Sequence, residues 1–130
     1  CEMHALCVRA VAQLARHDWE SARGDADAAL GLYEATPLVA YGLVPALNHL
    51  VDACFALVAE APPVIRSAQG ARLARALRFQ ARIARRLLVA QPGALRSQAR
   101  LCRQRGQEQK AAALIRQADA LIADWRAASF

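Results

Sequence analysis

Residues that favour β-strands are scarce in this sequence. Threonine occurs once, at Thr36, and aromatic residues make up 5% of the 130 residues. Alanine, the strongest helix former, occurs 32 times. The composition therefore argues against a β-rich fold. It predicts an all-α protein whose core is built from aliphatic side chains and closely packed alanine faces.

Long hydrophobic runs and secretion signals are also lacking. The longest stretch without a charged side chain covers residues 35–51, and two prolines, Asn48 and His49 make it a poor membrane span. The chain begins at Cys1 without a signal-type segment, and we expect a cytoplasmic fragment of a longer chain. The 56% hydrophobic content indicates either a surface that another molecule covers or simply an alanine-rich composition.

The four cysteines lack the dense spacing of a disulfide scaffold, so we expect reduced and mostly buried thiols. Cys1, His4 and Cys7 recur at helical spacing, but no fourth ligand is near, so we expect no metal site. His49 and Asp52 could form a hydrogen-bonded pair, yet no nucleophile accompanies them. No phosphate loop or nucleotide fingerprint is present. We therefore expect no cofactor and no enzymatic activity.

Acidic residues are missing from a long central segment. Between Glu60 and Glu108 there are eleven arginines and no acid. Residues 1–60 hold eight acids and three arginines, whereas residues 61–130 hold fourteen bases and three acids. This division favours head-to-tail self-association or contact with an acidic partner protein or upstream domain. A homo-oligomer could instead form through an apolar face of the third predicted helix, comprising Leu47, Leu50, Cys54 and Leu57.

Apolar residues recur with the helical period along the chain, and prolines, glycines and N-cap residues divide it into six segments. We expect helices over residues 2–16, 19–35, 37–61, 64–90 (or 67–90), 92–105 and 108–127. Asp18 is the expected N-cap of the second helix, and Thr36 is the expected N-cap of the third. Pro45 should kink the third helix or delay its start. Residues 91–93 should end the fourth helix, and Pro92 should open the fifth. Six helices with short connections predict about three antiparallel hairpins in a single domain, residues 1–130.

Two of these hairpins share one pattern. A turn residue, His17 or Gly106, is followed five positions later by alanine, then by an apolar residue and another alanine. The matching positions are Ala22, Ala26 and Ala29 in the first hairpin and Ala111, Ile115 and Ala118 in the second. Small residues at this spacing are typical of helical-repeat arrays, because they let neighbouring helices approach closely.

Residues 92–123 resemble a tetratricopeptide repeat. Counting from Pro92, the large residue is Leu95, the first small one is Ala99 and the turn glycine is Gly106. The departures from the pattern are Gln98 and Cys102 in this hairpin, and Arg9 and Gln13 in the first.

The middle hairpin, residues 37–91, is longer than a standard repeat. Such hairpins look like the tetratricopeptide-like C-terminal regions of large bacterial signalling proteins, which carry ATPase, nucleotide-cyclase or kinase modules upstream. The resemblance implies a superhelical stack of hairpins. It also implies a non-catalytic scaffold that binds other proteins.

Two rows of arginines are the candidate binding residues. On the fourth helix, an apolar arc that includes Leu88 lies opposite a basic face about 140° wide. The six arginines of this face are Arg72, Arg75, Arg78, Arg82, Arg85 and Arg86. On the fifth helix a second row occupies the face that lines the concave groove in tetratricopeptide arrays, and guanidinium groups there suit carboxylates. Our candidates are Arg78, Arg82, Arg85, Arg96, Arg100 and Arg103. The alternatives are ordinary solvated charge, or a basic module that binds nucleic acid or another polyanion.

Overall fold

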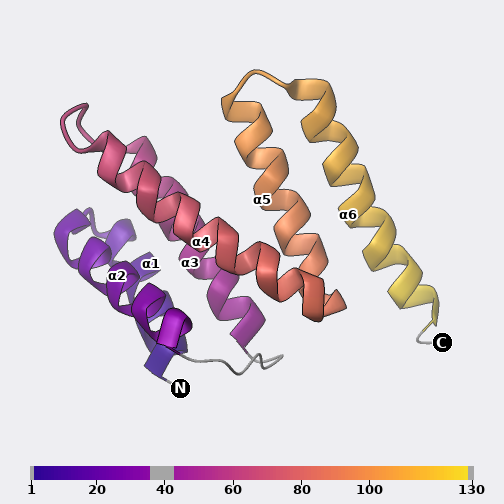
Figure 1. Ribbon diagram of the computed structural model, residues 1–130, viewed down its shortest axis with the longest axis horizontal. Coiled ribbons are helices and arrows are strands. Elements are labelled where there is room, and N and C mark those ends of the chain that lie inside the picture. The colour runs from indigo at the N-terminus through magenta and orange to yellow at the C-terminus, as the bar shows by residue number, and fades with distance from the viewer. Residues whose placement is uncertain (1, 36–42, 129–130) are drawn as a thin grey trace. The chain divides into compact units, whose positions relative to one another are not determined.

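The computed structural model describes residues 2–35 and 43–128, and its regular structure there is entirely helical (Figure 1). The α-helices are α1 (Glu2–Ala15), α2 (Trp19–Ala35), α3 (Leu43–Ala59), α4 (Arg66–Arg86), α5 (Gln91–Gln104) and α6 (Glu108–Ala128), with a short 3-10 helix, η1 (Leu88–Ala90). No strand occurs in this part of the chain. The all-α prediction is confirmed.

The chain forms two compact units, and the boundary between them falls within α4. Unit 1 is Cys1–Gln80 and unit 2 is Ala81–Phe130. In unit 1, α1 packs against both α2 and α3, and α2 also contacts α3. In unit 2, α5 and α6 form an antiparallel hairpin.

The turn between α1 and α2 satisfies the last carbonyl groups of α1. The Asp18 amide donates to the Gln13 carbonyl at 2.9 Å, and the His17 amide donates to the Leu14 carbonyl at 3.0 Å. His17 adopts a positive φ of 58°. This pair of bonds is the Schellman arrangement that ends many helices. Asp18 Oδ1 then accepts from the Ser21 amide, which confirms Asp18 as the N-cap of α2.

The turn between α5 and α6 has the same hydrogen bonds. The Gln107 amide donates to Cys102 at 2.9 Å and the Gly106 amide to Arg103 at 3.0 Å, with Gly106 at a φ of 75°. The alanines that follow each turn in the shared pattern, Ala22, Ala29, Ala111 and Ala118, are all fully buried. The alignment of the two hairpins is thus confirmed at the turns and at the close-packed positions.

The core of unit 1 is centred on α3. Phe55, Leu30, Leu47, Leu50 and Val51 are the largest of its fully buried apolar side chains. The four residues considered as a homo-oligomer face, Leu47, Leu50, Cys54 and Leu57, are buried among them. They are therefore not available as the surface of a dimer. In unit 2, a smaller cluster forms around Ala99, Cys102 and Ala111, with Leu114 and Ile115 packed against it.

The start of α3 was predicted at Pro37 with Thr36 as its cap, and both residues lie outside the described part of the chain. The described helix starts at Leu43 and carries Pro45 in its first turn, as a late start requires. A proline is accommodated there because the first amides of a helix have no acceptor within it.

The predicted end of α4 is wrong. The helix stops at Arg86, Leu87 is extended with φ −122° and ψ 112°, and α5 begins at Gln91. Pro92 lies in the first turn of α5, which confirms the prediction that it opens the fifth helix. The change of chain direction must therefore occur earlier, in residues 87–90. As a result, Leu88, expected on the apolar side of α4, is 65% exposed.

Candidate functional site

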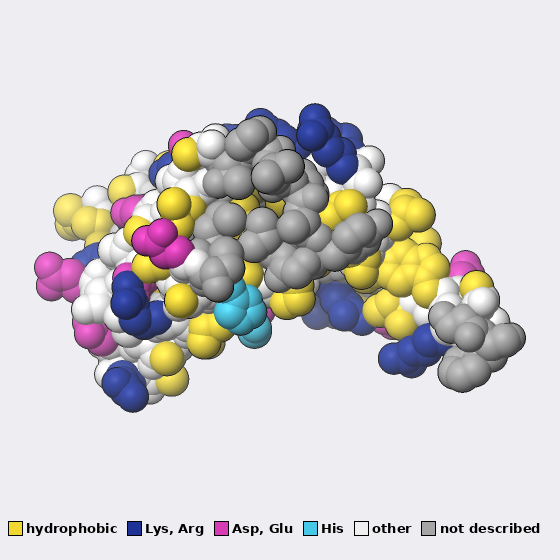
Figure 2. Space-filling model, turned by 90° about the horizontal axis from the view of Figure 1, so that it is seen from below, with side chains coloured by type: hydrophobic (Ala, Val, Ile, Leu, Met, Phe, Trp, Pro, Cys, Tyr) yellow, Lys and Arg dark blue, Asp and Glu magenta, His cyan; other side chains and the backbone are white. Residues whose placement is uncertain are grey.

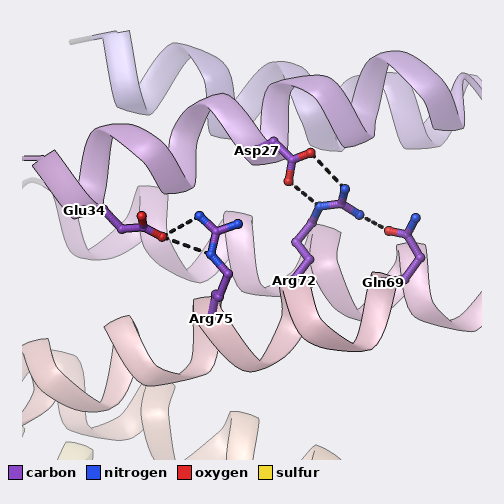
Figure 3. A network of polar contacts seen from close by, with 5 residues as sticks. All are labelled: Asp27, Glu34, Gln69, Arg72 and Arg75. Atoms are coloured by element: carbon purple, nitrogen blue, oxygen red, sulfur yellow. Dashed lines mark hydrogen bonds and ion pairs between the residues drawn. The ribbon is translucent and has the colours of Figure 1, made fainter. Parts of the chain in front are cut away.

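Arginines at the start of α4 bind acidic residues of α2 within unit 1 (Figure 3). Arg72 donates from Nε and Nη2 to the two carboxylate oxygens of Asp27, at 2.6 and 2.9 Å. Its remaining Nη1 donates to Gln69 Oε1. Arg75 donates from Nε and Nη2 to a single oxygen of Glu34, Oε1. These two members of the predicted basic face are therefore bound inside the molecule.

A third ion pair explains why the first hairpin departs from the repeat pattern. Arg9 donates from Nε and Nη2 to both oxygens of Asp25, at 2.7 and 2.8 Å. Hydrogen bonding to the Arg9 guanidinium lowers the pKa of Asp25, and Gln13 contributes in the same direction. Arg9 and Gln13 thus occupy two positions at which the repeat pattern is broken, and both interact with the Asp25 carboxylate of α2.

The net charge of each unit differs from that of each half of the sequence. Unit 1 contains seven basic and eight acidic residues, so the acids of the first half are nearly matched within it. Unit 2 contains ten basic and three acidic residues. On the face shown in Figure 2, most acidic side chains lie over unit 1, and a cluster of hydrophobic side chains lies over α5 and α6. The positive excess of the chain therefore belongs to unit 2.

The arginine row of α5 is exposed and is partly paired with acids of unit 2. Arg96 Nη2 donates to Asp119 Oδ1 at 3.2 Å, and both side chains are more than half exposed. Arg103 approaches Glu108 at 3.8 Å, also on the surface. Arg100 lies between them on the same face and is exposed. Exposed pairs of this kind contribute little to stability, so a carboxylate from another molecule can replace their acidic partners.

A hollow of about 440 Å³ lies within unit 2, between the end of α4 and the helices α5 and α6. Its side chains combine one guanidinium, three amides and two leucines with small residues. They are Ala81, Ala84, Arg85, Gln91, Ala94, Leu95, Gln98, Gln117 and Leu121. Its volume is in the range of ligand-binding clefts. Because it combines apolar walls with hydrogen-bonding groups, it can hold a chain segment that carries both kinds of group.

Arg85 is the one predicted candidate that lines this hollow. The α5 row does not line it, because at 100° per residue that row lies roughly 150° around the helix from Gln98 and its neighbours. Arg78 is exposed on the unit 1 part of α4, and Arg82 is exposed on the unit 2 part. The structure thus divides the six candidates between separate surfaces.

Gln91, Gln117 and Leu121 were missed from the sequence. The sequence feature that could have indicated this hollow is Gln98, a polar residue at a position where the repeat pattern has an aliphatic one. The residue at the matching position of the first hairpin is Arg9, which binds Asp25. In unit 2 the residue that matches Asp25 is Leu114, so Gln98 has no such acid opposite it. The side chain of Gln98 lines the hollow instead.

Cys7, Cys54 and Cys102 are free and buried, which confirms the prediction for the cysteines that the structure describes. Burial raises the pKa of Cys7 to about 11 and that of Cys54 to about 12. Both are therefore protonated near neutral pH and are not poised as nucleophiles. His49 and Asp52 are exposed on α3. Within residues 2–35 and 43–128, no group of three or more potential ligands could hold a metal ion.

None of the helices described here combines the length and apolarity needed to cross a bilayer. In comparisons with known proteins, no family model, no curated protein and no solved structure matches the chain.

Proposed function

We propose that this protein is a non-catalytic protein-interaction module that binds an acidic segment of a partner protein or neighbouring domain through unit 2. The observation that carries the proposal is the charge distribution. Acids of unit 1 bind Arg9, Arg72 and Arg75 internally, whereas unit 2 keeps a large positive excess. A surface with this excess attracts acidic partners and disfavours basic ones.

The hollow of unit 2 supplies the selectivity that charge alone does not. Among the described residues, no ion pair involves Arg85, so its guanidinium can donate two hydrogen bonds to one carboxylate. Gln98 and Gln117 offer amides that match the hydrogen-bonding groups of a peptide backbone, and Leu95 and Leu121 offer apolar contact. An acidic segment with an aliphatic residue fits this combination.

The architecture supports the same proposal. Matching turns join α1 to α2 and α5 to α6. Helix α1 contacts both α2, its partner in the hairpin, and α3, the first helix of the next hairpin, as successive repeats do in tetratricopeptide arrays. We propose that the hairpins stack in this manner, and that the module belongs to a bacterial cytoplasmic signalling protein in which it acts as a scaffold. The extended surfaces of such arrays bind peptides without catalysis.

The positive excess of unit 2 also favours a second candidate, a basic module that binds nucleic acid or another polyanion. The two differ in salt and sequence dependence. Phosphate binding weakens steeply with salt and is similar for unrelated sequences. Recognition in the hollow depends on the identity of the peptide.

A titration of the full chain separates these candidates. The probes are a fluorescein-labelled acidic peptide containing leucine, the same peptide with every leucine replaced by serine, and a single-stranded DNA of equal charge. Our proposal predicts that the leucine-containing peptide binds at least about tenfold more tightly than the serine version, the gain expected from burying one or two aliphatic side chains. Equal binding of all three probes, with a steep salt dependence, would refute it in favour of the polyanion candidate.

A further inference from the structure

A second, smaller hollow lies in unit 1, and none of the six candidate arginines lines it. Its volume is about 230 Å³. Four segments contribute to it: the first turns of α2, the end of α3, the connection after α3 and the beginning of α4. The lining residues are Trp19, Arg23, Leu57, Glu60, Ala61, Pro62, Ile65 and Gln69. Nothing in the proposed function uses these side chains.

Gln69 is the buried polar group of this hollow. It is 4% exposed, and its Oε1 accepts a hydrogen bond from Arg72, which is itself held by Asp27 (Figure 3). The amide is therefore fixed with its oxygen committed to Arg72. No hydrogen bond within the described residues uses its Nε2, and Nε2 is not among the fully enclosed atoms. Two donors of a positioned amide are thus left for a ligand.

Opposite charges line the same hollow without neutralising each other. Arg23 is half-buried, and Glu60 is exposed in the connection directly after α3. Within residues 2–35 and 43–128, no ion pair joins them. Trp19, Leu57 and Ile65 add aromatic and aliphatic wall. The hollow thus presents a cation with amide donors, an anion and an apolar surface within one small volume.

We propose that this hollow binds a free aliphatic α-amino acid, represented by L-leucine. The carboxylate accepts hydrogen bonds from Arg23 and from Nε2 of Gln69. The ammonium group donates to Glu60, and the side chain packs against the aliphatic wall beside Trp19. The volume is below the range typical of drug-sized ligands and cofactors, which favours a ligand of this size. The inference does not depend on the acidic partner proposed for unit 2.

The test is a titration of the full chain with L-leucine, followed by the fluorescence of Trp19 in a Trp125→Phe background. Because the chain has two tryptophans, this substitution leaves Trp19 as the single reporter. We expect saturable binding in the millimolar range. Leucine amide, which lacks the carboxylate charge, and N-acetyl-leucine, which lacks the ammonium group, should each bind about tenfold more weakly, because each loses a charged hydrogen bond.

Variants locate the site. Arg23→Gln and Glu60→Gln should each weaken leucine binding about tenfold. The matched controls Arg16→Gln and Glu20→Gln change exposed residues that do not line the hollow, and they should bind as the parent does. Melting curves establish that every variant is folded.

Two results would overturn the inference. One is a folded parent chain whose Trp19 fluorescence shows no saturable response to leucine. The other is N-acetyl-leucine binding as tightly as leucine, which would mean that the hollow takes only a carboxylate end, such as the C-terminal residue of a peptide.

Discussion

The Arg72–Asp27 pair offers the sharpest test of how α4 is held against α2. We consider the double-mutant cycle formed by Arg72→Leu, Asp27→Asn and the combined variant, each measured in the full chain by urea unfolding. The Arg72 side chain is 12% exposed and Asp27 is 50% exposed, and two hydrogen bonds join them. The pair is therefore neither fully solvated nor fully buried.

The expected magnitude follows from these exposures. Fully exposed pairs contribute about 0.2–1 kcal/mol, whereas breaking a fully buried pair costs about 3–5 kcal/mol. We expect a coupling energy of about 1–2 kcal/mol for Arg72 and Asp27, between these limits. Asp27→Asn alone should cost more than this coupling, because it leaves a largely buried guanidinium without a counter-charge.

The control is a second cycle on Arg103 and Glu108. Their closest atoms are 3.8 Å apart, and the side chains are 54% and 73% exposed. We expect a coupling of less than about 0.5 kcal/mol there. A coupling for Arg72 and Asp27 that is as small as this control would refute the conclusion that this pair holds α4 against α2.

Three further results are expected. Ala118→Leu should destabilise unit 2 by roughly 1–3 kcal/mol through overpacking, whereas Ala128→Leu at the exposed end of α6 should leave urea unfolding unchanged; equal effects would mean that the hairpin register is wrong. The pKa of Asp25 is lowered in the folded state, so its carboxylate stabilises the fold at pH values above its unfolded pKa of about 3.9. This stabilisation is lost as the pH falls through the lower folded pKa. Asp25→Asn should therefore flatten the acid limb of a plot of unfolding free energy against pH. Cys7 and Cys54, whose pKa values are raised by burial, should react with a thiol reagent at pH 8 only after unfolding. Rapid labelling of either residue in the folded chain, located by peptide mapping, would contradict their burial.

Local features of the fold could be predicted from the sequence because they depend on neighbouring residues. The turns at His17 and Gly106, the cap at Asp18 and the close-packed alanines all follow from patterns spanning a few positions. The end of α4 could not be predicted in this way, because three of the residues 87–90 are leucine or alanine, which favour helix. The opening of α5 by Pro92 was predicted correctly, but the extended Leu87 that ends α4 was not.

The candidate site could be predicted only in part. The sequence shows an excess of arginine, but it does not show which arginines find an acid about 40 residues away in the chain, as Arg75 does with Glu34. Nor does helical periodicity reveal the hollow of unit 2, which forms where three helices meet. Arg85 was identified by its charge, whereas Gln117 gave no signal, since glutamine on an exposed helix face is ordinary.

The most direct test of the proposed function compares two arginines on the same helix. The full chain, Arg85→Ala and Arg78→Ala are titrated with the labelled acidic peptide at fixed salt, with melting curves run in parallel. Both residues are exposed, but Arg85 lines the hollow of unit 2 and Arg78 lies in unit 1. We predict that Arg85→Ala weakens binding about tenfold, the loss of one charged hydrogen-bonding group, while Arg78→Ala binds as the parent does. Equal affinities for the two variants would contradict the assignment of the binding site to unit 2.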